Sequence, residues 1–240
     1  MQMPRFSDVL ADVVGRSAGV LFDFDGPICD VFRGLPASGV AVSLAEIVAT
    51  RAPALASRAQ ATDDPMEIHR LSQEGGEALL ADVEAALTIA EIAAVKVAGP
   101  PVAGAVEALA AAKDSNRRIA VVSNNSAECV REYLTIHGID GTVDAVVGRP
   151  ALRPDLMKPD PYPLFAAAET LDIEPAALVL IGDSTTDVEA ARAAGVPSIG
   201  FANKPRKRFT LADAGADVVV LGMDAVADSL AAAGVVQQRA

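Results

Sequence analysis

Short apolar segments alternate with segments of helical spacing along most of this 240-residue chain, and this alternation limits the folds that it can adopt. Strands that are apolar at consecutive positions are typical of a parallel sheet buried on both faces. We therefore expect an α/β fold, a doubly wound, mostly parallel and Rossmann-like sheet with ligands bound at the carboxyl ends of its strands. The expected strands are Ala18–Asp23, Arg118–Ser123, Val143–Val147, Ala177–Gly182, Val196–Gly200 and Asp217–Leu221, and the expected helices are Val102–Lys113, Ser126–His137, Pro161–Leu171 and Thr185–Ala194.

One long stretch, residues 31–98, contains no strand-like segment and interrupts the alternation. It is rich in Ala, Leu and Glu, which favour helices, and glycines and prolines flank it on both sides. We expect an inserted helical domain at 31–98 and an α/β core formed by 1–30 and 99–240. The expected helices of the insertion are Val40–Arg51, Pro65–Gln73 and Glu77–Val97.

The charge of the chain argues against a polyanionic partner. Thirty-two acidic and 20 basic residues give a formal net charge of −12, so a nucleic acid or an anionic membrane would be repelled at long range. Cys29 and Cys129 lie far apart and form no metal-binding or disulfide pattern. Asp8 and Asp12 interrupt the apolar segment that a signal peptide would need, and no apolar run reaches membrane-spanning length. We expect a cytoplasmic protein with a small-molecule partner, and no pattern indicates its oligomeric state.

Two carboxylates end the first expected strand, in the sequence Asp23-Phe24-Asp25-Gly26. Because side chains alternate along a strand, Asp23 and Asp25 would point to the same side. At an effective dielectric constant of about 20, two carboxylates about 4 Å apart repel by roughly 4 kcal/mol, unless a cation binds or one carboxylate takes a proton. A divalent metal is the simplest solution, although an acidic turn built around Gly26 would give the same pattern.

Three further polar segments follow later strands or the loops beyond them. Ser123-Asn124-Asn125-Ser126 would serve as an anion site or as a helix cap, and Lys158 precedes a helix that begins with proline. Alone, such a lysine is usually a solvated surface charge. Asp183 and Asp187 end the fourth expected strand and begin a helix, and an oxygen-only cluster of this kind suits Mg²⁺.

Together these four segments, in this order, resemble the motifs of the haloacid dehalogenase-like hydrolases. The resemblance runs from about Ala18 to Leu221 and is strongest to the phosphatase branch that carries a helical cap after the first motif, as in proteins like phosphoglycolate phosphatase. The chain departs from the family pattern at Pro27, where Thr or Val commonly follows, which puts the detail of that loop in doubt. Asp25 distinguishes the chain from the dehalogenating branch, so we do not expect carbon–halogen cleavage.

The resemblance implies a role for each motif residue. Asp23 would be the nucleophile that forms an aspartyl-phosphate, and Asp25 would be the general acid and base. Ser123 and the backbone of Asn124 would hold phosphoryl oxygens, and Lys158 would offset negative charge. The expected cofactor is Mg²⁺, held by Asp23, Asp183 and the Asp25 backbone carbonyl, with Asp187 supporting the metal or Lys158 from behind.

The implied activity is Mg²⁺-dependent hydrolysis of a small phosphorylated metabolite, and a sugar-phosphate phosphomutase that uses the same core residues is the alternative. Substrate choice would depend on the cap, which closes over such sites. Arg149, in the loop beyond the third strand, is a candidate for an anionic group of the substrate. The polar candidates in the cap are Arg51, Arg58, Glu67, His69, Arg70 and Glu74.

Overall fold

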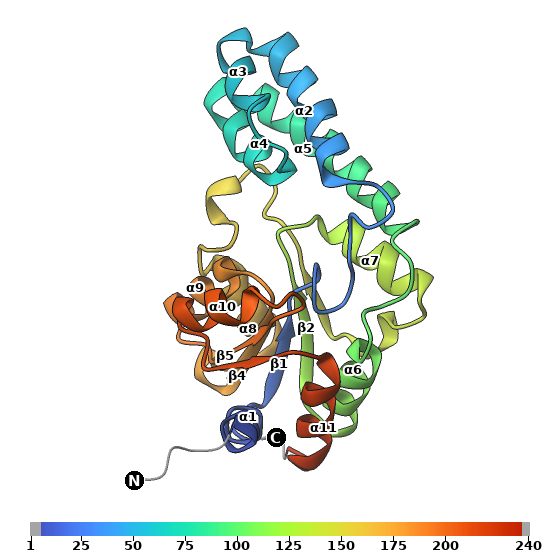
Figure 1. The fold of residues 1–240 in the computed structure, drawn as a ribbon, viewed down its shortest axis with the longest axis vertical. Helices are drawn as coiled ribbons and strands as arrows, with labels where there is room; N and C mark the ends of the chain where they lie inside the picture. Colours follow the sequence, from blue (N-terminus) through green and yellow to red (C-terminus); the bar gives the residue numbers. More distant parts are fainter. Residues whose placement is uncertain (1–5, 237–240) are drawn as a thin grey trace.

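A six-stranded, fully parallel sheet forms the centre of the protein in the computed structural model, which describes residues 6–236 (Figure 1). The strand order β3-β2-β1-β4-β5-β6 places the first strand in the middle, between the second and the fourth. Each strand overlaps an apolar segment identified in the sequence and extends at most one residue beyond it, so the expected α/β fold with a parallel sheet is confirmed. The strands are β1 (Gly19–Phe22), β2 (Arg118–Val122), β3 (Ala145–Val147), β4 (Leu178–Gly182), β5 (Ser198–Phe201) and β6 (Val218–Val220).

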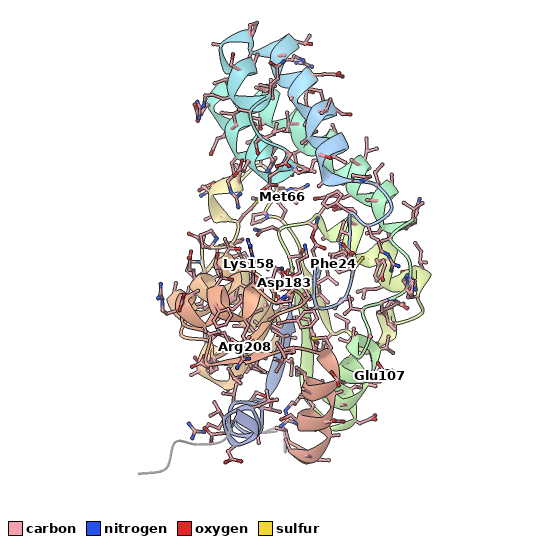
Figure 2. All side chains as sticks on the ribbon, in the orientation of Figure 1. Phe24, Met66, Glu107, Lys158, Asp183 and Arg208 are labelled. Atoms are coloured by element: carbon pink, nitrogen blue, oxygen red, sulfur yellow. The ribbon has the colours of Figure 1, made fainter. Side chains whose placement is uncertain are left out.

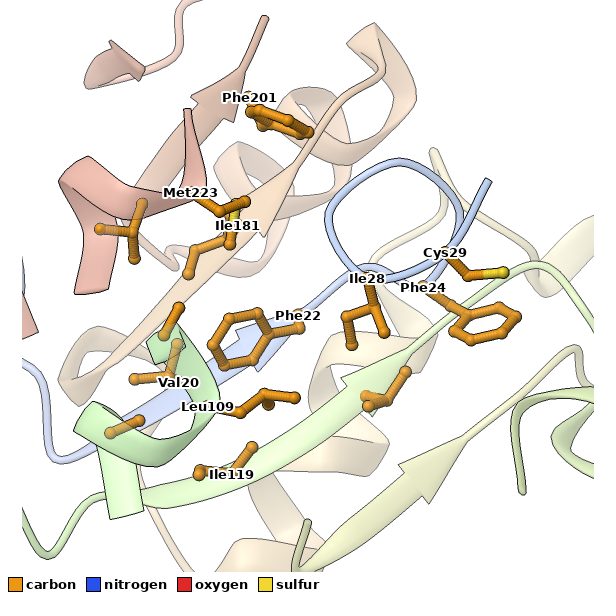
Figure 3. Close-up of a cluster of buried hydrophobic side chains, with 14 of the residues drawn as sticks. Val20, Phe22, Phe24, Ile28, Cys29, Leu109, Ile119, Ile181, Phe201 and Met223 are labelled. Carbon is orange, nitrogen blue, oxygen red and sulfur yellow. The ribbon is translucent and has the colours of Figure 1, made fainter. Parts of the chain in front are cut away.

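Alternate side chains of the strands enter two separate hydrophobic clusters, one on each face of the sheet. On one face, Phe22 of β1 and Ile181 of β4 belong to a large cluster with residues of five helices, one of which comes from the segment between β1 and α6, and Figure 3 shows Phe22 beside Leu109. Leu21 and Leu180 point to the opposite face, where two helices cover them. The first face is covered by α1 (Phe6–Gly15), α6 (Ala105–Asp114), α7 (Ala127–Ile136) and α11 (Met223–Ala232), and the second by α8 (Tyr162–Leu171) and α9 (Thr185–Ala194).

Three of the helices around the sheet were not expected from the sequence. They are α1 and α11, which contact each other beside the sheet, and α10 (Lys207–Ala214), which packs on α9 through Leu211 and Val188. These helices have only 10, 10 and 8 residues, and helices this short depend on tertiary packing for their stability. The first five and last four residues of the expected core domain lie outside the described range.

The segment between β1 and α6 is helical and forms a separate hydrophobic cluster around Leu44, Val48, Ile68 and Leu87. In Figure 1 these helices lie at the end of the molecule opposite α1 and α11. They are α2 (Ala37–Arg51), α3 (Ala56–Ala59), α4 (Pro65–Ser72) and α5 (Glu77–Val95), with short 3₁₀ turns at Pro53–Leu55 and Gln73–Gly75.

Helix α5 belongs to both parts of the molecule. Val83 and Leu87 pack among the inserted helices, whereas Ala94 and Val95 at its end pack in the main cluster against the sheet. The last turns of α5 therefore pack with the sheet, although they precede residue 98. Across residues 6–236, none of the helices is both long and apolar enough to cross a membrane.

Candidate active site

A tight loop follows β1 and presents the two carboxylates of the first motif. The backbone amides of Gly26, Ile28 and Cys29 close this loop, so the missing N–H of Pro27 removes none of these hydrogen bonds. Asp23 Oδ1 accepts the amide of Phe24 at 2.8 Å. Asp25 Oδ1 accepts the amide of Val31 at 3.0 Å. Burial raises the pKa of Asp25 to about 6, against the lowering effect of that hydrogen bond, so this carboxyl can exchange a proton near neutral pH.

Lys158 lies beneath the carboxylates and is only 2% exposed, although an isolated lysine in a loop is usually solvated. Its Nζ donates to Asp23 Oδ1 at 2.8 Å, to Asp187 Oδ1 at 2.5 Å and to the Val122 carbonyl at 3.1 Å. Burial alone lowers the pKa of Lys158, but the two carboxylates outweigh burial and raise it. Lys158 is therefore a fixed positive charge that links the first and fourth motifs.

The loop after β2 holds Ser123 and Asn124 in different ways. The Ser123 hydroxyl is buried, donates to Asn125 Oδ1 at 3.2 Å and accepts the Asn125 amide at 3.0 Å. The Asn124 side chain donates Nδ2 to the Lys158 carbonyl at 3.1 Å and accepts the Lys158 amide at 2.9 Å. Asn124 thus fixes the backbone of the lysine, a contact that the sequence did not suggest. Ser126 caps α7 by accepting the Cys129 amide at 3.3 Å.

Asp183 and Asp187 follow β4 and complete an acidic cluster with Asp23. One carboxylate oxygen from each of the three lies within 4.8 Å of the others. Asp187 is held from behind, because its Oδ2 accepts the amide of Ser184 at 3.0 Å and the hydroxyl of Ser184 at 2.6 Å, at the start of α9. Burial and the neighbouring Asp187 raise the pKa of Asp23, with Lys158 acting in the opposite direction, so this carboxylate requires positive charge nearby to remain ionised.

Two residues outside the recognised motifs bind Asp183. Asn203 Nδ2 donates to Asp183 Oδ2 at 2.8 Å, and Lys207 forms an ion pair with the same oxygen. Lys207 belongs to the basic run Lys204–Arg208, and in a chain with a net charge of −12 such a run is typical of a solvated loop and helix start. The structure instead places Lys207 at the acidic cluster.

Gly26 allows Asp183 to approach the loop after β1. Its φ is +110°, and a Cβ atom there would overlap the carboxyl group of Asp183. The result is a compact set of oxygen donors with a net negative charge, which fits a hard cation such as Mg²⁺. Asp23, Asp183 and Asp187 each have one carboxylate oxygen close enough to the others to hold such an ion.

Arg149 has a different environment from the one expected. Its guanidinium is buried and donates to Glu91 of α5 at 2.8 Å, to the Asn124 carbonyl at 3.1 Å and to the Thr88 hydroxyl at 3.1 Å. Glu91 also accepts the Asn125 side chain at 3.1 Å and the Ser126 amide at 3.0 Å. The sequence suggested Arg149 as a ligand for an anionic group of the substrate; the structure places it outside the cavity lining, where it connects α5 to the loop after β2.

A cavity of about 560 Å³ opens above the four motifs. Asp23, Asp25, Ser123, Lys158 and Asp183 line its floor. Figure 2 shows Met66 on the underside of the inserted helices, opposite Lys158 and Asp183. The polar cap residues that the sequence suggested do not line it. The residues that do so from the inserted segment are Phe32, Ala37, Ser38, Asp63, Asp64, Pro65 and Met66.

Comparison with known proteins agrees with this geometry. Residues 18–195 match the family model of the haloacid dehalogenase-like hydrolases. A phosphoglycolate phosphatase of Cupriavidus necator is 36% identical over 129 residues, which cover 54% of this chain and 52% of that protein. The chain thus spans about half the length of the curated relatives that it matches first.

Solved structures show the same fold at low sequence identity. A predicted phosphoglycolate phosphatase from Haemophilus somnus has a TM-score of 0.63 at 19% identity, over 89% of this chain and 97% of that one. A putative β-phosphoglucomutase from Bacteroides vulgatus has a TM-score of 0.63 at 20% identity, over 95% of this chain and 97% of that one. With the family match across most of its length and the four motifs assembled at one sheet edge, the chain belongs to the haloacid dehalogenase-like hydrolases.

Proposed function

We propose that the protein is a Mg²⁺-dependent phosphomonoesterase that hydrolyses a small phosphorylated metabolite through an aspartyl-phosphate on Asp23. The observation that carries this proposal is the buried Lys158, which holds one oxygen of Asp23 at 2.8 Å at the floor of the cavity. Within residues 6–236, no hydrogen bond engages the other oxygen, Asp23 Oδ2. Asp23 is thus oriented with a free oxygen for nucleophilic attack.

The two carboxylates of the first motif divide the chemistry. Asp23 Oδ2 forms a bond to phosphorus while the bond from phosphorus to the leaving oxygen breaks, and Asp25 gives that oxygen a proton. Asp25 then takes a proton from water, whose oxygen attacks the phosphorus of the aspartyl-phosphate, releases inorganic phosphate and restores Asp23. The Ser123 hydroxyl and the backbone N–H of Asn124 hold phosphoryl oxygens during both steps.

Several groups of this chain would hold the cofactor. Asp23, Asp183 and the Asp25 backbone carbonyl would bind Mg²⁺, and Asp187 would keep Lys158 in place beside them. When bound, Mg²⁺ supplies positive charge that lets the anionic Asp23 approach an anionic phosphate. Asn203 and Lys207 restrain Asp183 through its Oδ2.

The inserted segment would act as a cap. We propose a catalytic core of residues 1–30 and 99–240 and a cap of 31–98, with the end of α5 packed into the core. Phe32, Asp64 and Met66 then meet the leaving group from the cap side of the cavity. Both cysteines are buried and unpaired, which agrees with a reducing compartment such as the cytoplasm.

Phosphate release tests this proposal. Purified protein is incubated with a panel of phosphorylated metabolites and 4-nitrophenyl phosphate, with Mg²⁺ and with excess EDTA. We expect release that requires Mg²⁺ and falls at least about a thousandfold in Asp23→Asn, because the amide is a poor nucleophile. The unfolding temperature of the variant serves as the folding control.

Two other results would contradict the proposed reaction or its mechanism. Isomerisation of a sugar phosphate without net phosphate release would establish the phosphomutase alternative, which uses the same core residues. Undiminished release by a folded Asp23→Asn variant would contradict the aspartyl-phosphate mechanism.

A further inference from the structure

The cap side of the cavity carries negative charge from two adjacent residues. Asp63 and Asp64, in the turn between α3 and α4, both line the cavity. Asp64 Oδ1 accepts the Met66 amide at 2.8 Å and caps α4, which fixes its carboxylate at the start of that helix. Asp63 is exposed, and no hydrogen bond or ion pair joins its carboxylate to another residue in the described part of the chain.

Within residues 6–236, no lysine or arginine of the inserted segment lines the cavity. Arg51 and Arg58 pair with Asp82 and Glu74 on the outer surface of the inserted helices. Arg70 is outside the lining and donates Nη2 to the Lys158 carbonyl at 3.2 Å.

The whole described lining of the cavity has the same imbalance. Lys158 is its one ammonium, and this group is already bonded to two carboxylates. The lining contains six carboxylates, those of Asp23, Asp25, Asp63, Asp64, Asp183 and Asp187.

This distribution of charge separates the two ends of a bound phosphomonoester. The phosphoryl end would lie at Asp23 and Lys158, and the leaving group would extend toward Asp63 and Asp64. A second anionic group on the substrate would face these carboxylates without a counter-charge, whereas a hydroxyl group could donate hydrogen bonds to them and an ammonium would attract them.

We propose that the cavity selects phosphomonoesters whose leaving group is a neutral polyol or a cationic amino alcohol, and discriminates against those that carry a carboxylate or a second phosphate. The inference rests on the proposed phosphatase function and names its substrate class. It separates this chain from the activities that its relatives' names suggest. Phosphoglycolate contains a carboxylate, and xylulose-1,5-bisphosphate, present in a structure of similar fold from Rhodobacter sphaeroides, contains a second phosphate.

Three two-carbon esters provide a matched test, because they differ only in the group at the far end. Ethanolamine phosphate carries an ammonium, 2-hydroxyethyl phosphate a hydroxyl and 2-phosphoglycolate a carboxylate. We expect kcat/KM to decrease in that order, with at least about a tenfold difference between the first and the last. Higher ionic strength would reduce the difference, because the two aspartates are exposed to solvent.

A double variant tests the residues. Asp63→Asn with Asp64→Asn removes both charges, and asparagine at position 64 still caps α4. We expect the ratio of kcat/KM for ethanolamine phosphate to that for 2-phosphoglycolate to fall about tenfold. Glu46→Gln with Glu77→Gln is the control, since it removes two charges from exposed positions outside the cavity and would leave the ratio unchanged.

The outcomes separate the two proposals. Absence of phosphate release from all three esters and from 4-nitrophenyl phosphate would overturn the proposed phosphatase function itself. Release with 2-phosphoglycolate as the best of the three, or a ratio that does not respond to the double variant, would overturn the charge selection and leave the phosphatase function standing.

Discussion

Gly26 determines how closely Asp183 approaches the carboxylates of the first motif. Alanine at this position would be strained at a φ of +110°, and its Cβ would overlap the Asp183 carboxyl group. We expect Gly26→Ala to reduce phosphate release at least about a hundredfold and to weaken the response to Mg²⁺, since Asp183 must move. Titration of activity with Mg²⁺ measures both effects.

Gly39 is the matched control for Gly26→Ala. It lies in α2, and a Cβ there would have nothing within 4 Å. Gly39→Ala should leave activity intact and raise the free energy of unfolding by about 1 kcal/mol, as alanine favours helices. Equal activity in the two variants would show that the approach of Asp183 is not important.

Glu91 is a positioning residue that acts through the loop after β2. Its carboxylate binds Arg149, Asn125 and the Ser126 amide, and Asn125 in turn holds the hydroxyl of Ser123. Glu91→Gln leaves the Arg149 guanidinium buried without its counter-charge, so we expect the free energy of unfolding to fall by about 3 kcal/mol.

The kinetic consequence of Glu91→Gln distinguishes positioning from stability alone. Because Ser123 would hold the phosphoryl group, kcat should fall about tenfold, with a smaller change in KM, under conditions in which the variant is still folded. Urea unfolding and steady-state kinetics measure the two effects. Glu107→Gln, at an exposed position of α6, is the control and should change neither quantity. An unchanged kcat in a destabilised Glu91→Gln variant would reduce Glu91 to a purely structural role.

At the residue scale the sequence predicted the catalytic groups better than their partners. Asp23 and Asp183 were expected because each directly follows a strand, a local pattern. The family resemblance named Lys158, which lies 135 residues from Asp23, but Lys207, which lies 24 residues from Asp183, belongs to no such motif, and no local pattern reveals either pair. The ion pair of Arg149 with Glu91 could not be predicted for the same reason, since Glu91 resembles any other glutamate of an amphipathic helix.

Among the elements, α4 carries a buried histidine that should make stability depend on pH. His69 is fully buried, its Nε2 lies 3.2 Å from Glu84 Oε2, and its Nδ1 has no hydrogen-bonding partner among residues 6–236. Burial, assisted by Arg149 and opposed by Glu84 and Glu91, lowers the pKa of His69 to about 4. Its pKa in the unfolded chain is about 6.5. Between these values the unfolded chain binds a proton that the folded chain does not, so stability decreases as pH falls.

Replacement of the histidine isolates this contribution. Native protein should lose about 2 to 3 kcal/mol more than His69→Gln between pH 7 and pH 4.5, because only the native protein titrates at this position. Urea unfolding at the two pH values measures the difference. An equal loss in both proteins would show that His69 is protonated to the same degree in the folded and the unfolded chain.

The strands were easier to predict than the helices, for physical reasons. A strand buried on both faces is typically apolar at consecutive positions, and the strands other than β5, which contains Ser198 and Gly200, had this pattern. Helices α1 and α11 contribute only a narrow apolar face, through residues such as Leu10 and Leu230, to a cluster that other elements complete. The helical pattern of α5 was visible, but its division between two clusters was not, since both of its ends are equally apolar.

The whole molecule contains two packing units that share α5, and their stabilities should be separable. Leu44 is buried in the cluster of the inserted helices, and Ile119 is buried in the main cluster beside the sheet. Truncation of either to alanine removes buried methyl groups and should cost about 2 to 5 kcal/mol within its own unit.

Leu44→Ala should therefore speed amide hydrogen exchange in α2 and α4 while the amides of β1 and β4 keep their protection. Ile119→Ala should instead speed exchange in the sheet, and because α5 ends in the main cluster, the inserted helices should lose protection with it. Hydrogen exchange is measured by mass spectrometry on the full chain. This asymmetry is expected if the inserted helices need the folded core for their stability but the core does not need them. Equal loss of protection throughout the molecule in both variants would mean that α5 couples the two clusters into one cooperative unit, and that the cap cannot open without unfolding the sheet.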